Sequence, residues 1–134
     1  VLLLEEQGKL RLSDPLSRYF PELPAYAARI QLSDLIYHTS GLRDFFKLAH
    51  LTGLTDSSDF LNQQEVFELI ARQKTLNFSP GTQYLYNNSG YFLLANVVER
   101  VSGQSLRSFA QTNIFQPLGM GDTFFNYGSS PEIA

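Results

Sequence analysis

Tyr86 and Asn88, separated by one residue, are the side chains in this sequence whose types and spacing best suit chemistry on a carbonyl group. A phenol can relay a proton, and a carboxamide can hydrogen-bond a substrate carbonyl or amide. The turn sequence Ser79-Pro80-Gly81 precedes the pair, and a long apolar helix is predicted to begin next to it, near Ser89. We therefore expect one short, braced segment to hold both side chains.

The sequence lacks the nucleophile that such a pair would serve. It has no cysteine, which excludes a thiolate. None of its lysines, Lys9, Lys47 and Lys74, has a serine three residues before it, so there is no Ser-x-x-Lys. In the nearest approach, Ser40-Gly41-Leu42-Arg43, the arginine stays protonated and cannot act as a base. Gly-x-Ser-x-Gly and Lys-Thr-Gly are absent too, so the chain carries part of a catalytic site.

The composition is that of one soluble globular domain. The chain has 134 residues, 43% of them hydrophobic and 17% charged, which is enough to bury a core. A net charge of −3 without a basic cluster argues against nucleic acid as a partner. His38 and His50 occur without a cluster of acids, so we expect no metal site and no cofactor. The apolar run from Val1 to Leu4 is too short to be a transmembrane segment.

Apolar spacing and turn residues predict a mainly helical chain. The most apolar helix runs from about Ser89 to Ser102, where one narrow polar stripe predicts burial on nearly all sides. Leu94 and Val98 should be nearly inaccessible. Further helices are predicted over residues 31–38, 45–51 and 62–73, and from Ser105 to the Pro117-Leu118-Gly119 turn with Ile114 on its inner face.

Several segment ends carry local signals. Asn62 and Glu65 have the spacing of a capping box, and Gly41 is a stop signal for the helix over residues 31–38. Residues 83–86 are predicted to be extended, and a loop is expected after Leu51. Residues 1–7 have the pattern of the end of a helix that Gly8 terminates. We therefore expect residues 1–134 to be a partial domain of a longer protein, with N- and C-terminal parts outside this sequence.

Four stretches, in this order, resemble the class C β-lactamase-like serine hydrolases, a superfamily shared with penicillin-recognising enzymes, D-aminopeptidases and some esterases. Together they cover most of the chain, and residues 43–77 are the least typical. The stretches are Leu2 to Leu16 (LLLEEQGKLRLSDPL), Ile30 to Leu42 (IQLSDLIYHTSGL), Phe78 to Val101 (FSPGTQYLYNNSGYFLLANVVERV) and Gly103 to Phe125 (GQSLRSFAQTNIFQPLGMGDTFF).

In that family three motifs build the active site. Ser-x-x-Lys supplies nucleophile and base, Tyr-x-Asn supplies a proton relay and a substrate ligand, and Lys-Thr-Gly or His-x-Gly lines the far wall. The resemblance implies that Tyr86 is catalytic and that Asn88 binds substrate, with the other two motifs before Val1 and after Ala134. The implied fold is mainly α: the helical domain of the α/β β-lactamase/transpeptidase-like fold, lacking most of the sheet.

Tyr86 and Asn88 each have a structural alternative as well. Tyr86 could be a half-buried packing residue, and within this chain its phenol is expected to be neutral. Asparagine is a preferred helix N-cap, so Asn88 could be a cap, although Asn87 or Ser89 could share that task.

Other polar residues are interpreted as structural. His38 is interpreted as a C-terminal helix residue favoured by the helix dipole, and not as a catalytic partner of Ser40, which is interpreted as a turn residue. Glu65 and Glu68 are expected on an exposed helix face.

The resemblance implies a serine hydrolase that forms an acyl-enzyme on an amide or ester, with a β-lactam, peptide or ester as substrate. Two alternatives stay open: a penicillin-binding or sensor relative with slow turnover, and a non-catalytic interaction module on the same scaffold. The chain alone is expected to be inactive, and to self-associate through apolar surface around Leu2 and Leu3. An exported or periplasmic location would fit a bacterial protein of this family, but no signal in these residues assigns it.

Overall fold

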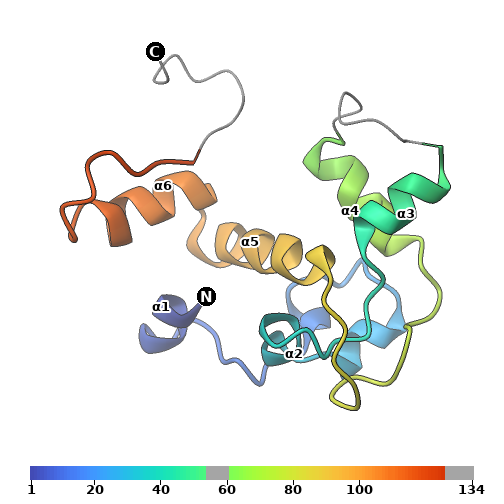
Figure 1. Cartoon of the computed structure of the whole chain (residues 1–134). Helices are drawn as coiled ribbons and strands as arrows, with labels where there is room; N and C mark the ends of the chain where they lie inside the picture. Colours follow the sequence, from blue (N-terminus) through green and yellow to red (C-terminus); the bar gives the residue numbers. More distant parts are fainter. Residues whose placement is uncertain (54–60, 126–134) are drawn as a thin grey trace.

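The chain consists mainly of short helices arranged around one longer helix, α5 (Figure 1). The computed structural model describes residues 1–53 and 61–125. In these two ranges, β pairing is limited to one antiparallel bridge between Pro15 and Gln31. The helices are α1 (Leu2–Glu6), α2 (Leu32–Ile36), α3 (Phe45–Leu51), α4 (Gln63–Ala71), α5 (Asn88–Ser102) and α6 (Leu106–Ala110), with 3₁₀ turns at Leu16–Arg18 and Ala25–Arg29 and a π-helical turn at Gln111–Phe115.

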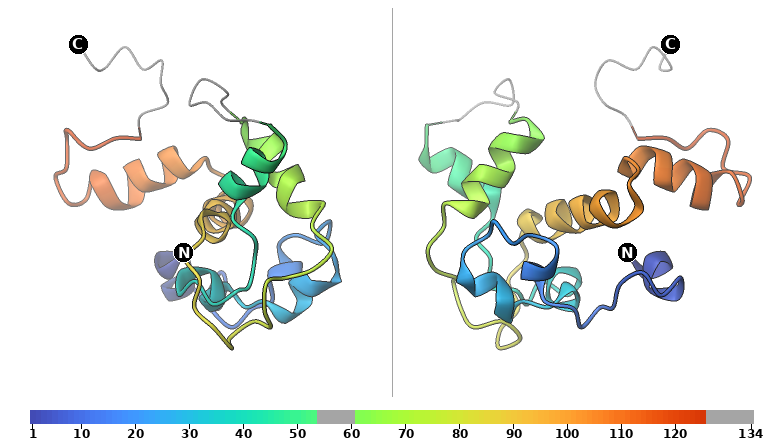
Figure 2. Two further views of the ribbon diagram at one scale, coloured as in Figure 1. Left: turned by 45° about the vertical axis from the view of Figure 1, so that its right-hand side comes forward. Right: turned by 180° about the vertical axis from the view of Figure 1, so that it is seen from behind.

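Helix α5 crosses the centre of the molecule and contacts α2, α3 and α6 (Figures 1 and 2). Leu94 and Val98 are only 6% and 3% exposed, as expected from the apolar pattern. Only Tyr91 and Arg100 of this helix are exposed, so burial on nearly all sides is confirmed. Gly103, in the left-handed conformation with φ 69°, ends the helix as predicted.

The polar stripe of α5 holds neighbouring elements in place. Asn96 accepts a hydrogen bond from the Gln63 amide of α4 at 2.6 Å, and Glu99 accepts one from the Leu106 backbone N–H of α6 at 3.0 Å. Arg100 forms an ion pair with Glu22 and lies over the Phe20 ring, 4.3 Å from its centre. The few polar side chains of a mostly apolar helix therefore connect it to three other segments.

Gly90 allows the N-terminal end of α5 to lie against α2. A Cβ atom at this position would be 3.0 Å from the Leu35 carbonyl oxygen, closer than side chains normally come. Leu32 and Leu35 of α2 are fully buried and belong to the same core as the apolar face of α5. This close approach places the residues that follow α2 beside the residues that precede α5.

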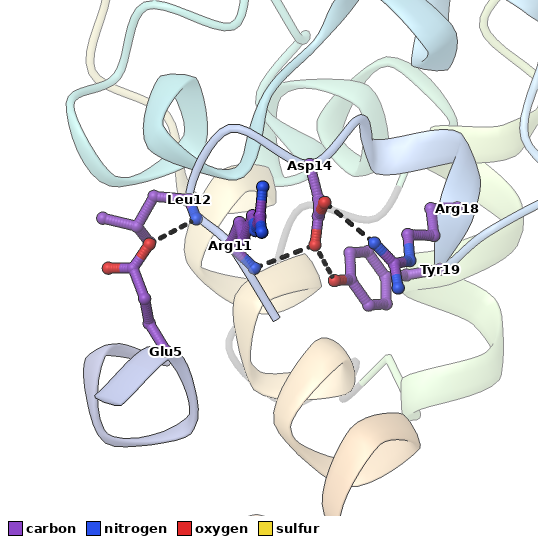
Figure 3. A network of polar contacts seen from close by, with 6 residues as sticks. All are labelled: Glu5, Arg11, Leu12, Asp14, Arg18 and Tyr19. Carbon is purple, nitrogen blue, oxygen red and sulfur yellow. Dashed lines mark hydrogen bonds and ion pairs between the residues drawn. The ribbon is translucent and has the colours of Figure 1, made fainter. Parts of the chain in front are cut away.

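A buried carboxylate organises the segment between α1 and α2 (Figure 3). Asp14 accepts hydrogen bonds from the Arg11 N–H at 2.8 Å, from Arg18 Nη1 at 2.9 Å and from the Tyr19 hydroxyl at 2.6 Å. Burial disfavours the ionised carboxyl, but these hydrogen bonds and the charge of Arg18 outweigh it and hold the pKa of Asp14 below its usual value. Burial and the bond to Asp14 raise the pKa of Tyr19 to about 12.

Local signals placed several elements correctly. The helix predicted over residues 45–51 is α3, and the capping box of Asn62 and Glu65 begins α4, with backbone–side-chain bonds of 3.0 and 2.8 Å. Glu65 is exposed, as expected, and Glu68 is partly exposed and pairs with Arg72 at 3.0 Å. Most of the loop predicted after Leu51 lies outside the described residues.

Two expectations were wrong in detail. Helix α2 ends at Ile36, five residues before Gly41, so Gly41 does not terminate it. Glycine is needed at position 41 for another reason: a Cβ atom there would lie 2.2 Å from the Phe78 carbonyl oxygen of a neighbouring loop. Residues 83–86 lie outside any helix or regular strand, and the Leu85 N–H donates a hydrogen bond to the His38 carbonyl oxygen at 3.0 Å. Ile114 is 38% exposed, because the π-helical turn after α6 changes the angular position of later side chains.

No helix in the two described ranges is both long and apolar enough to cross a bilayer.

Candidate active site

Asn87, and not Asn88, caps helix α5. Asn87 has an extended backbone, and its Oδ1 accepts a hydrogen bond from the Gly90 N–H at 2.9 Å, which satisfies one of the free N–H groups at the helix start. Its Nδ2 donates to the Leu85 carbonyl at 3.2 Å, and the side chain is buried. The capping interpretation of Asn88 is therefore wrong, because its neighbour Asn87 performs that task.

Tyr86 and Asn88 lie on one short segment and contact each other. The Tyr86 hydroxyl donates to Asn88 Oδ1 at 3.3 Å, a long hydrogen bond for a hydroxyl donor. Tyr86 is 59% exposed, so it is not a half-buried packing residue in this chain. With its proton directed at Asn88, the phenol leaves its oxygen lone pairs free to accept a hydrogen bond from another donor.

Asp44 holds Asn88 from the opposite side. One carboxylate oxygen, Oδ2, accepts from both the Asn88 backbone N–H at 2.6 Å and Asn88 Nδ2 at 2.7 Å. The other oxygen, Oδ1, caps α3 by accepting from the Phe46 and Lys47 N–H groups at 3.0 and 3.3 Å. The sequence interpretation did not include Asp44, although an aspartate directly before an apolar helix is an N-cap signal.

His38 lies beside this pair, but not as a helix residue. It follows the end of α2 in the left-handed conformation, with φ 58°, which is uncommon for a residue other than glycine. Its ring lies 4.6 Å from the Tyr86 ring, 5.3 Å from that of Tyr91 and 6.0 Å from that of Tyr84. The predicted helix-end position was therefore wrong: His38 serves as the centre of an aromatic cluster that supports one side of Tyr86.

Ser40 is not positioned as a nucleophile. It is fully buried, and its Oγ accepts a hydrogen bond from the Leu42 N–H at 3.3 Å. This geometry agrees with the turn role expected from the sequence. Across residues 1–53 and 61–125, no group of three or more histidine or acidic side chains could hold a metal ion.

An open pocket of about 390 Å³ adjoins Tyr86 on the side of α3. Arg43, Asp44 and Lys47 form part of its wall, and the leucines Leu48, Leu51 and Leu85 form an apolar part. Because Tyr86 also lines this pocket, a molecule with both apolar and anionic groups could lie against Tyr86. Pockets with a mainly apolar lining and a few polar groups are typical ligand sites.

Comparison with known families decides what kind of protein carries this site. The sequence model of the family described as Beta-lactamase matches residues 1–133. The chain belongs to the Beta-lactamase family. This finding confirms the resemblance seen in the four stretches of sequence. It also confirms the fold class, since the described residues form the helical part of the β-lactamase/transpeptidase fold.

Similar proteins in the Beta-lactamase family are longer than this chain. It is 34% identical over 134 residues to penicillin-binding protein 4* of Bacillus subtilis (strain 168), covering 98% of this chain and 29% of the relative. It is 37% identical over 120 residues to a D-aminopeptidase of Brucella anthropi, covering 89% and 22%. The D-amino acid amidase of Ochrobactrum anthropi SV3, solved with L-phenylalanine, has a TM-score of 0.75 and 32% identity, covering 91% of this chain and 34% of that chain.

Proposed function

We propose that this chain is the helical part of a serine hydrolase that forms an acyl-enzyme on an amide or ester. The observation that carries the proposal is the Tyr86–Asn88 hydrogen bond at the N-terminal end of α5, in a chain of the Beta-lactamase family. Both side chains match the Tyr-x-Asn motif of that family. The pocket that Tyr86 lines offers space for a substrate group next to Tyr86.

The proposed reaction has an acylation step and a hydrolysis step. A serine outside this chain attacks the substrate carbonyl carbon, and a lysine beside that serine accepts the serine proton. Tyr86 relays that proton to the leaving nitrogen or oxygen as the substrate bond breaks, and Asn88 hydrogen-bonds the acyl part of the substrate. Water then attacks the acyl-enzyme carbonyl, which releases the acid and restores the serine hydroxyl. In this scheme Ser-x-x-Lys precedes Val1, and the third motif follows Ala134.

The proposed substrates are β-lactams, peptides or esters with an accessible carbonyl group. Two relatives are named for D-aminopeptidase and D-amino acid amidase activity, which supports an amide as the reacting bond. The apolar and cationic wall of the pocket suits an acyl group or leaving group that carries both an apolar part and a carboxylate.

A serine-directed fluorophosphonate probe tests this function. The full-length protein should become labelled on a serine in Ser-x-x-Lys, and the isolated chain should remain unlabelled because it has no such motif. A full-length protein without Ser-x-x-Lys would leave only the non-catalytic interaction module. Stoichiometric labelling of Ser40 in the isolated chain would show that the nucleophile has been misplaced.

A slow-turnover penicillin-binding protein is the second candidate, favoured by the similarity to penicillin-binding protein 4* over 98% of the chain. The two candidates differ in the step after acylation. With a chromogenic β-lactam, a hydrolase should open the β-lactam ring continuously, whereas a slow-turnover protein should open about one equivalent in a burst and then stop.

A further inference from the structure

We propose that Asp44 is a positioning residue that sets the orientation of the Asn88 carboxamide, and through it the direction of the Tyr86 hydroxyl. This inference rests on the proposed function of Tyr86 and Asn88. It adds a residue that belongs to none of the three catalytic motifs and lies 44 positions away from Asn88.

The contact between Asp44 and Asn88 is short and double. The same oxygen, Asp44 Oδ2, accepts from the Asn88 backbone N–H at 2.6 Å and from Nδ2 at 2.7 Å. Such lengths are typical of hydrogen bonds to a charged acceptor, which are about twice as strong as neutral ones. Two bonds from one residue to one oxygen fix both the backbone and the side-chain torsion of Asn88.

The Asp44 carboxylate also determines whether the NH₂ group or the oxygen of the Asn88 amide faces Tyr86. An ionised carboxylate only accepts hydrogen bonds, so the NH₂ group of Asn88 must face Asp44 and the carbonyl Oδ1 must face Tyr86. In its contact with Asn88 the Tyr86 hydroxyl is then the donor, which turns the phenol lone pairs outward until the proton is relayed. The second N–H of Asn88 Nδ2 stays available to donate to a substrate carbonyl oxygen. If the amide were reversed, its NH₂ group would face Tyr86 and its oxygen would face the Asp44 carboxylate, which cannot donate a hydrogen bond.

Asp44 itself cannot turn away easily. It is only 8% exposed, and its other oxygen is committed to the N–H groups of Phe46 and Lys47 at the start of α3. The preceding residue is also tied to α5, because the Ser89 hydroxyl donates to the Arg43 carbonyl at 2.7 Å. The start of α3 and the start of α5 are therefore joined at two adjacent residues, which holds the amide in one position before substrate arrives.

A purely structural role makes a different prediction. Asp44 could matter only because it satisfies free N–H groups at the start of two helices. In that case its loss would lower stability, and activity would fall whether or not Asn88 has a side chain. If Asp44 instead acts through the Asn88 amide, its effect on the reaction should depend on that amide.

A double-mutant cycle in the full-length protein separates these roles. Asp44→Asn keeps the shape, but an amide can accept on only one side, so either α3 loses its cap or a donor faces Asn88. Acylation should slow by about 10- to 100-fold, as when a reacting group is misplaced by about 1 Å. On an Asn88→Ala background the same change should alter acylation by less than about twofold. Equal losses on both backgrounds would overturn the proposal.

Asp14→Asn is the matched control, because Asp14 is equally buried, also accepts several hydrogen bonds and lies on the segment between α1 and α2. It should lower the melting temperature without slowing acylation at a temperature where the protein stays folded. If Asp14→Asn slows acylation as much as Asp44→Asn, the effect of Asp44 is general destabilisation and the proposal fails.

An NMR measurement on the full-length protein tests Asp44 independently of the reaction. The Asn88 side-chain NH₂ should show one proton shifted downfield by the carboxylate, and Asp44→Asn should abolish that shift. An Asn88 NH₂ signal like that of a solvated asparagine, unchanged by Asp44→Asn, would overturn the proposal. A full-length protein that forms no acyl-enzyme, in which Asn88 nevertheless shows the shift, would instead contradict the proposed function and leave the positioning contact standing.

Discussion

Asn87 caps α5 by accepting the Gly90 N–H at 2.9 Å, and this bond releases the next residue, Asn88, from a capping role. Two adjacent asparagines thus have separate tasks. One is buried and begins the helix, and the other directs its carboxamide between Asp44 and Tyr86. The separation can be tested by changing the two residues one at a time.

Asn87→Ala should lower the stability of the chain by about 1 kcal/mol, the usual cost of losing an N-cap. Asn88→Ala in the full-length protein should weaken acylation, since a substrate ligand is lost. Urea unfolding and acylation rates should be measured for both variants. A larger acylation defect in Asn87→Ala than in Asn88→Ala, at equal folded fractions, would show that Asn87, and not Asn88, contacts the substrate.

Tyr86→Phe in the full-length protein should reduce turnover by about 10²–10⁴, the range for a general acid–base step, with little change in melting temperature. The ring and its contact with His38 remain, and only the hydroxyl is lost. Tyr84→Phe is the control, because Tyr84 is also an exposed member of the His38 cluster. Turnover of Tyr86→Phe close to that of Tyr84→Phe would remove the catalytic role.

Leu94→Ala should cost about 2–5 kcal/mol of unfolding free energy, because it opens a cavity beneath the central helix. Ile114→Ala should cost clearly less, since Ile114 is partly exposed after the π-helical turn. Denaturant unfolding of both variants, compared at equal m-values, measures the difference. Similar losses at the two positions would mean that residue 114 is packed inside after all.

Asp14 should make the stability of the chain depend on pH in acid. Its folded pKa is below the ordinary value of about 3.9, so its contribution is present above that pH and is lost as pH falls through the folded pKa. Asp14→Asn should therefore flatten the stability curve below about pH 4. Thermal melts of wild type and variant across that interval provide the check, and parallel curves would contradict the role of this carboxylate.

The isolated chain should self-associate through apolar side chains such as Leu2, which is 61% exposed. Exchange of segments between copies is one route. Sedimentation velocity at increasing concentration should show species larger than a monomer, and Leu2→Lys should reduce them. A clean monomer at high concentration in the wild type would rule out this association.

Much of the helical framework could be predicted from sequence because its signals are local. The capping box of Asn62 and Glu65 is complete within one turn of helix, and the periodic apolar residues of α5 define its buried face whatever packs against them. The pairing of Tyr86 with Asn88 is also local, since only one residue, Asn87, lies between the two partners in the chain. The family motif pointed to the same two residues.

The surroundings of that pair were decided by tertiary structure. His38 has a left-handed backbone just after the end of α2, and its ring lies near three tyrosine rings. No local sequence signal predicts either feature. Asp44 reaches Asn88 only because α3 and α5 begin side by side, although 44 positions separate the two residues. Residue type determined which groups can donate and accept, whereas the packing of helices determined which of them meet, because hydrogen bonds form only over about 3 Å.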